Sequence, residues 1–119
     1  MTIKEIADRL VVLCRAADFD TAQRELFSQD AISIEPRETP AFKKETRGLN
    51  SIIEKNKKFE EMTAQLHGVK ISEPILAENS FAMRMDMDIT MKERPRSTFT
   101  ELCVYRVKDG KIISEQFFE

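Results

Sequence analysis

The order of the predicted elements indicates an α+β fold, because helical patterns come early in the chain and strand patterns come late. After residue 66 the sequence alternates polar and apolar positions between turn signals. The clearest alternation, F-A-M-R-M-D-M-D-I-T-M at residues 81–91, places four of the six methionines on one strand face. We therefore expect a single domain over residues 1–119, in which three helices cover the concave face of a curved antiparallel sheet.

Two amphipathic helices are expected first. Over residues 3–17 the apolar side chains recur at intervals of three and four, and Thr2 with Glu5 can form a capping box. Asp18 is the expected N-cap of a second, shorter helix that ends near residue 27. Together these helices supply the first apolar faces that a sheet can pack against.

The middle of the chain is expected to hold a strand, a loop and a third helix. Residues 30–35 switch to a period of two and stop at Pro36. Residues 37–47 are mostly charged, contain a second proline and show no period, which predicts a loop. A helix is then predicted over residues 48–66, with the charges at 54–61 forming its solvated face.

The remainder of the chain predicts an antiparallel meander. The strands are separated by turn signals, the last of which is Asp109-Gly110, a pair typical of a tight hairpin. Because consecutive strands joined by short turns usually pair with each other, four neighbouring strands are expected. They span residues 67–76, 81–92, 98–107 and 112–118.

Composition narrows the classes of partner. The formal net charge is −2, so no basic excess indicates a nucleic-acid partner. The N-terminal residues M-T-I-K-E-I-A-D-R-L contain no long apolar run, which predicts neither a secretory signal nor a membrane partner. We therefore expect a cytoplasmic protein. Cys14 and Cys103 lie far apart without C-x-x-C spacing, which favours two free thiols.

Three segments carry a resemblance to a known family: D-A-I-S-I-E-P at 30–36, R-G-L at 47–49 and V-Y-R-V-K-D-G-K-I at 104–112. Their order and spacing resemble the nuclear transport factor 2-like superfamily, and within it the SnoaL-like and ketosteroid-isomerase-like branch. The resemblance implies a cone-shaped cavity between the helices and the sheet. It also implies a homodimer through the outer sheet face, which alternation predicts to present Arg84, Asp86, Asp88, Thr98, Thr100 and Gln116.

The same alternation predicts which side chains line the cavity. The inward set is expected to be Met83, Met85, Met87, Phe99, Glu101, Cys103, Tyr105, Glu115 and Phe117. Glu35 matches the position of the catalytic carboxylate in the ketosteroid isomerases that the chain resembles. His67 shares its parity with Val69 and Ile71, so it is also expected to point inward. Glu35 and His67 are therefore the candidate catalytic pair.

The resemblance is incomplete where an isomerase stabilises its enolate. The two positions that hold a tyrosine and a protonated aspartate in ketosteroid isomerases correspond here to Val11 and Cys103. Valine offers no hydrogen bond and a thiol offers a weak one. Steroid isomerisation is therefore not expected, and any oxyanion site must be built from Tyr105, His67 or Glu101.

Two hypotheses of function follow. In the first, the chain binds a small apolar molecule in a Met/Phe-lined cavity and acts on it without a cofactor, as an isomerase, cyclase or hydrolase that uses Glu35 and His67 for acid/base chemistry. In the second, the cavity is filled by side chains and the chain is a non-catalytic, dimeric binding protein. A zinc or manganese site built from His67 with Glu35, Glu101 or Glu115 is a minor alternative, since one histidine with carboxylates can hold either metal. No metal is expected, because the chain has no H-x-x-x-H or C-x-x-C spacing.

Overall fold

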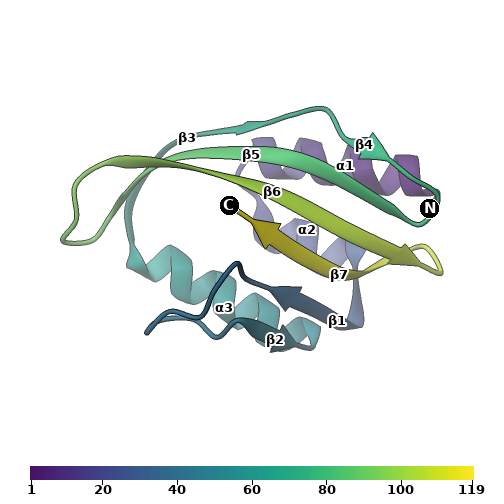
Figure 1. Cartoon of the computed structure of the whole chain (residues 1–119), viewed down its shortest axis with the longest axis horizontal. Helices are drawn as coiled ribbons and strands as arrows, with labels where there is room; N and C mark the ends of the chain where they lie inside the picture. The colour runs from purple at the N-terminus through teal and green to yellow at the C-terminus, as the bar shows by residue number, and fades with distance from the viewer.

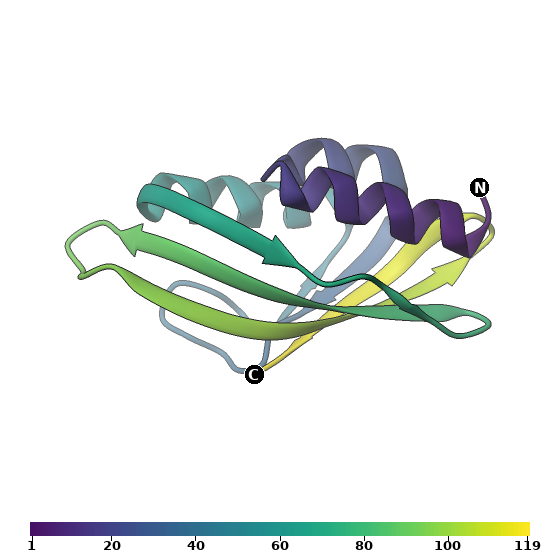
Figure 2. The same ribbon diagram turned by 90° about the horizontal axis from the view of Figure 1, so that it is seen from above.

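The computed structural model describes all residues from 1 to 119. The three helices lie on one side of a curved, open sheet, as Figures 1 and 2 show from two directions. This confirms the predicted α+β class. In chain order the elements are α1 (Ile3–Arg15), α2 (Phe19–Leu26), β1 (Phe27–Ile34), β2 (Glu45–Arg47), α3 (Leu49–Met62), β3 (Thr63–Ile71), β4 (Ile75–Leu76), β5 (Ser80–Met91), β6 (Ser97–Lys108) and β7 (Lys111–Phe118).

The first two helices begin where the sequence predicts. Thr2 and Glu5 form the reciprocal capping box of α1, so two of the free N–H groups at this helix end are satisfied. The Asp18 side chain accepts a hydrogen bond from the Thr21 N–H and caps α2. These caps fix where each amphipathic helix starts, and hence which residues turn toward the sheet.

Two helix ends differ from the prediction. The third helix ends at Met62 instead of residue 66, because the backbone from Thr63 onward is extended and pairs with β5. The Thr63 hydroxyl donates to the Phe59 carbonyl and so satisfies one acceptor at the helix end. Similarly, Phe27 already belongs to β1, which therefore starts three residues earlier than expected. In both places pairing across the sheet overrides the helical spacing of the local sequence.

The strand order is β2-β1-β7-β6-β5-β3, and the short β4 also pairs with β5. The predicted meander is present as the run β3-β5-β6-β7, in which every pair is antiparallel. The sheet as a whole is mixed, however, because β1 runs parallel to β7. This corrects the wholly antiparallel prediction: most of the chain lies between these two strands, so no hairpin fixes their relative direction. The predicted loop also contains β2, which pairs with β1.

The tight hairpin between β6 and β7 is present at Asp109-Gly110. Both residues have positive φ, 52° and 74°, as a type I′ turn requires. The turn pairs Val107 with Ile112, and an irregularity between Arg106 and Val107 then shifts the register by one, so that Tyr105 lies opposite Glu115 and Cys103 opposite Phe117. The hairpin and this irregularity together decide which side chains of the last two strands share the inner face.

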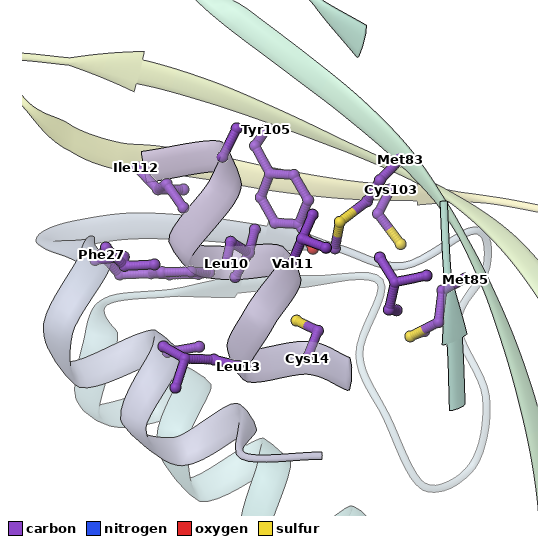
Figure 3. Packing of buried hydrophobic residues seen from close by; sticks show 14 of the residues in the cluster. Leu10, Val11, Leu13, Cys14, Phe27, Met83, Met85, Cys103, Tyr105 and Ile112 are labelled. Atoms are coloured by element: carbon purple, nitrogen blue, oxygen red, sulfur yellow. The ribbon is translucent and has the colours of Figure 1, made fainter. Parts of the chain in front are cut away.

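The hydrophobic core lies between the helices and the inner sheet face. Figure 3 shows side chains of α1 directed toward those of β5 and β6. The aromatic rings of Phe81 and Tyr105 stack with centroids 5.0 Å apart, and both side chains are buried. Cys14 and Cys103 are free and buried. None of the helices has the length and apolar content that a membrane crossing needs.

Candidate functional site

A cavity of about 230 Å³ lies between the helices and the inner face of the sheet. Most of its lining is apolar, as is usual for a site that holds a small molecule. The wall includes nine of the residues that sequence alternation and the resemblance assigned to it: Glu35, Met83, Met85, Met87, Phe99, Glu101, Tyr105, Glu115 and Phe117. Cys103 and His67 are not among the lining residues.

A chain of hydrogen bonds connects the polar groups on one side of this cavity. The Lys55 ammonium donates to Glu35 Oε1 at 2.9 Å and to Ser33 Oγ at 2.6 Å. Ser33 Oγ in turn donates to Glu115 Oε1 at 2.7 Å. Ser33 and Glu115 are the two buried polar residues of the molecule. Burying such groups is costly unless they are bonded, and the chain from Lys55 satisfies both.

Glu101 differs from these groups because its carboxyl has no hydrogen-bond partner from the protein. Burial, and to a smaller extent the nearby carboxylates of Glu35, Glu119 and Glu115, raise the pKa of Glu101 to about 7, while the charge of Lys55 acts in the opposite direction. At neutral pH both protonation states of Glu101 are therefore populated. This is the condition under which a carboxyl group can both accept and return a proton.

Glu115 is more deeply placed than Glu101 and is held by the hydrogen-bond chain. Burial raises its pKa, and the charge of Lys55 and the hydrogen bond from Ser33 act in the opposite direction. The result is a fixed carboxyl at the inner end of the chain, whereas the Glu101 carboxyl is unbonded at the cavity wall. The two glutamates therefore have different chemical roles available to them.

His67 lies on the opposite side of the sheet from the cavity. Its Nε2 is 2.8 Å from the hydroxyl of Thr90, a residue on the polar face of β5. The reason is an irregularity in the pairing of β3 with β5 between Leu66 and Gly68. Such a bulge shifts the alternation of side chains by one, so parity with Val69 no longer predicts the direction of His67.

Cys103 is fully buried in the core behind the cavity wall, with Val11 on the facing helix, as Figure 3 shows. Burial raises the pKa of Cys14 to about 12 and that of Cys103 well above its usual range. Both sulfurs therefore stay as thiols at neutral pH, and a buried thiol is a poor nucleophile. The positions that form an oxyanion site in ketosteroid isomerases accordingly contribute packing here.

Sequence reasoning missed several groups of the site, among them Ser33 in the hydrogen-bond chain. Lys55 was predicted to be solvated, yet its side chain is only 15% exposed and lines the cavity. Its spacing of three from Ile52 and four from Phe59 places it on the apolar stripe of α3, and this signal was available in the sequence. Phe42 comes from the predicted loop and Gln23 from α2. Neither showed a local pattern that marked it as part of a site.

Comparison of the sequence and the structure with known proteins identifies the family of this chain. A family model described as the SnoaL-like domain matches residues 1–119. A crystal structure from Mesorhizobium loti, described as a candidate SnoaL-like polyketide cyclase with the further label carbohydrate phosphatase, is 31% identical. Each chain is covered completely, and the TM-score is 0.92. The chain therefore belongs to the SnoaL-like domain family.

More distant structures share the fold alone. A protein of unknown function with a cystatin-like fold from Xanthomonas campestris has 17% identity and a TM-score of 0.84, over 99% of this chain and 90% of that one. A nuclear transport factor 2-like protein of unknown function from Burkholderia pseudomallei has 12% identity and a TM-score of 0.79, over 99% and 91%. No curated protein matches the sequence.

Proposed function

We propose that this protein binds a small, largely apolar molecule in the cavity and transfers a proton to or from it through Glu101. The observation that carries this proposal is an unbonded carboxyl group on the wall of a methionine- and phenylalanine-lined cavity. A desolvated carboxyl with a pKa near neutrality is suited to general acid/base work. Membership of a family that includes a candidate polyketide cyclase is consistent with such chemistry.

The proposed step is proton abstraction from a carbon next to a carbonyl group. Ionised Glu101 takes the proton and becomes a neutral carboxylic acid, and the C–H electron pair moves into an enolate. Glu101 then returns the proton at another carbon, which completes an isomerisation. Alternatively the enolate attacks a second carbonyl of the same molecule, which closes a ring, and the alkoxide so formed takes the proton from Glu101. The Lys55 ammonium on the cavity wall is the group that can stabilise the enolate oxygen.

The proposal assigns the acid/base role to Glu101, whereas the sequence predicted Glu35 and His67. Glu35 forms an ion pair with Lys55, so we assign it the task of holding that ammonium in position. His67 is bonded to Thr90 on the outer side of the sheet, away from the cavity lining. The proposal needs no cofactor, because the proton moves between Glu101 and the substrate alone.

Deuterium exchange tests the step directly. 2-Tetralone is a neutral bicyclic ketone with acidic hydrogens next to its carbonyl, and its exchange in D₂O is followed by proton NMR. We expect the protein to accelerate exchange above the buffer rate, with a rate that rises as the pH passes through about 7 and Glu101 ionises. Glu101→Gln should lose at least 90% of the acceleration, since removing a general base costs roughly 10²–10⁴-fold.

The matched control is Glu61→Gln, which changes an exposed glutamate on α3. It should exchange 2-tetralone at the parent rate. Exchange no faster than in buffer, or equal exchange in the parent and in Glu101→Gln, would show that Glu101 does not transfer the proton. Binding of 2-tetralone without exchange would favour the non-catalytic binding protein.

We also propose that the protein is a homodimer through the outer sheet face and that it is cytoplasmic. Leu102 and Phe118 are cross-strand partners on this face, with exposures of 52% and 43%. Adjacent exposed apolar side chains of this size are typical of a surface that contacts a partner. Sedimentation velocity at micromolar concentration should give a dimer, and Leu102→Asp should give a monomer. A monomeric parent protein would contradict the proposal.

A further inference from the structure

We propose that the molecule bound in this cavity carries a protonated amine on an apolar body, with the amine placed against Glu101. The inference rests on the proposed function and deepens it by naming the class of ligand. Three features of the wall lead to it: unbonded hydrogen-bond acceptors, an excess of acidic groups, and aromatic and thioether surfaces.

The first feature is the kind of hydrogen-bonding group that the wall leaves unbonded. Gln23 is one of the lining residues, and its buried Oε1 has no donor. The Glu101 carboxyl likewise has no donor from the protein. The strongest donor of the wall is largely engaged, because Lys55 gives two of its three N–H groups to Ser33 and Glu35. A ligand that supplies N–H donors and no competing acceptor complements this arrangement.

The second feature is charge. The wall carries three carboxyl groups, those of Glu35, Glu101 and Glu115, and one ammonium group, that of Lys55. Lys55 is already paired with Glu35 at 2.9 Å. An anionic ligand would therefore meet two further carboxyls and would have to share the single ammonium with Glu35, whereas a cation would balance ionised Glu101. Burial strengthens both effects, since the low dielectric of the cavity screens charges weakly.

The third feature is the surface that surrounds these acceptors. Phenylalanine rings attract cations through their faces, and the thioethers of Met83, Met85 and Met87 are polarisable. The rings of this region already interact with ammonium groups: Lys55 Nζ is 5.9 Å from the ring centroid of Phe117, and Lys58 Nζ is 5.2 Å from that of Phe42. The same wall can therefore hold an organic cation and its hydrocarbon body.

An amine beside Glu101 is also compatible with proton transfer. A positive charge favours the ionised carboxylate, so it lowers the pKa of Glu101. The carboxylate then remains ionised, and able to act as a base, at lower pH values. The groups that face Glu101 are Glu35 at the end of β1, Glu115 on β7, Glu119 at the C-terminus and Lys55 on α3. Of these, Lys55 alone is positive, and the ligand would supply the second positive charge.

Three ligands on one bicyclic frame test the inference: 2-aminotetralin as the cation, 2-tetralone as the neutral ketone and tetralin-2-carboxylate as the anion. Isothermal titration at pH 8 should show the amine binding about tenfold or more tightly than the ketone, because hydrogen bonds to a charged group are stronger than neutral ones. The carboxylate should show no measurable binding.

The pH dependence identifies the carboxyl responsible. Glu101 is mostly ionised at pH 8 and mostly protonated at pH 6, given a pKa of about 7. Affinity for the amine should therefore fall by about tenfold between pH 8 and pH 6, while affinity for the ketone should change little. Glu101→Gln should remove the preference for the amine at both pH values, and Glu61→Gln should retain it. Gln23→Leu should reduce the preference in part.

The possible results separate the two proposals. If 2-tetralone binds and exchanges but 2-aminotetralin binds no tighter, the proposed proton transfer stands and the amine inference is overturned. If the preference for the amine persists in Glu101→Gln, the inference is wrong about the group that holds the amine. If none of the three compounds binds, both proposals fail. Amine preference without exchange supports the inference and removes the catalytic role of Glu101.

Discussion

Side chains of β5 and β6 alternate between the two faces of the sheet, and the pKa values of the acidic groups shift in opposite directions on these two faces. On the outer face Asp86 accepts a hydrogen bond from Thr100, and Asp88 pairs with Arg96. These partners lower the pKa of both aspartates. On the inner face the pKa of Glu101, the direct neighbour of Thr100, is raised to about 7. Residues that are adjacent in sequence thus differ because they face different surroundings.

This difference between the two faces helps to identify the functional site. The outer-face aspartates are paired with arginine side chains or with a hydroxyl group, so neither of them lacks a partner. The inner face is covered by helices, so each polar group there must be bonded or costs free energy. Glu115 meets this requirement through Ser33, whereas half-buried Glu101 lies on the cavity wall without a bond from the protein. An unbonded carboxyl on a covered apolar face therefore marks a function better than a charged residue on the open face.

The largest expected effect is a loss of stability when a side chain on the inner face is shortened. Phe81→Ala removes a fully buried ring that stacks on Tyr105 and should lower the free energy of unfolding by about 3–5 kcal/mol. Leu102→Ala, on the outer face, should cost less than about 1 kcal/mol, measured under conditions where the oligomeric state is unchanged. Urea denaturation measures both. Equal costs would contradict the contrast between the faces.

The next effect concerns the hydrogen-bond chain at the cavity. Lys55→Met leaves Ser33, Glu35 and buried Glu115 without their cation and should cost about 1–3 kcal/mol. The matched control is Lys57→Met, two residues along the same helix, where the lysine is exposed. Its stability should be within about 0.5 kcal/mol of the parent. An equal loss in both variants would show that the chain of bonds contributes nothing specific.

A smaller effect, of opposite sign, is expected at Glu101. Its pKa is raised from 4.5 to about 7 on folding, so the folded state binds the proton more tightly and loses stability as pH rises through this range. Glu101→Gln removes that loss. We expect the variant to be more stable than the parent by about 1–2 kcal/mol at pH 8, after allowance for partial exposure, and nearly equal to it at pH 4.5.

Guanidinium chloride would screen these charges, so the comparison requires urea melts at matched ionic strength. A variant that is less stable than the parent at pH 8 would mean that Glu101 is satisfied in solution. Gain of stability together with loss of proton transfer is what a group retained for function should give.

The smallest effect is expected on the outer face. Asp88→Asn weakens the pair with Arg96, and its effect on the thermal midpoint should be smaller than any of those above and should vanish in 1 M salt. Because the pKa of Asp88 is lowered, any stabilisation is present at neutral pH and is lost as pH falls through the folded-state pKa. A salt-independent loss would show that this outer charge is as important as an inner one.

Much of the fold could be predicted because it depends on local patterns. Helix caps at Thr2 and Asp18, the turn at Asp109-Gly110 and the alternation of β5 each act over a few residues. The errors occur where distant segments decide. The end of α3 and the start of β1 depend on strand pairing, and the parallel pairing of β1 with β7 depends on how the chain returns after the third helix.

The candidate site can likewise be divided into features that depend on local sequence and features that depend on tertiary contacts. The sequence by itself determined that Met83, Met85 and Met87 share a face, and that Glu101 and Glu115 share faces with aromatic residues, because strand geometry alternates side chains without reference to the rest of the chain. Only the tertiary structure decided which of these groups are bonded. It brought Lys55 to Glu35 and Ser33, turned His67 outward at a bulge, and left Glu101 without a partner. Bonding partners lie far apart in sequence, and local spacing carries no information about them.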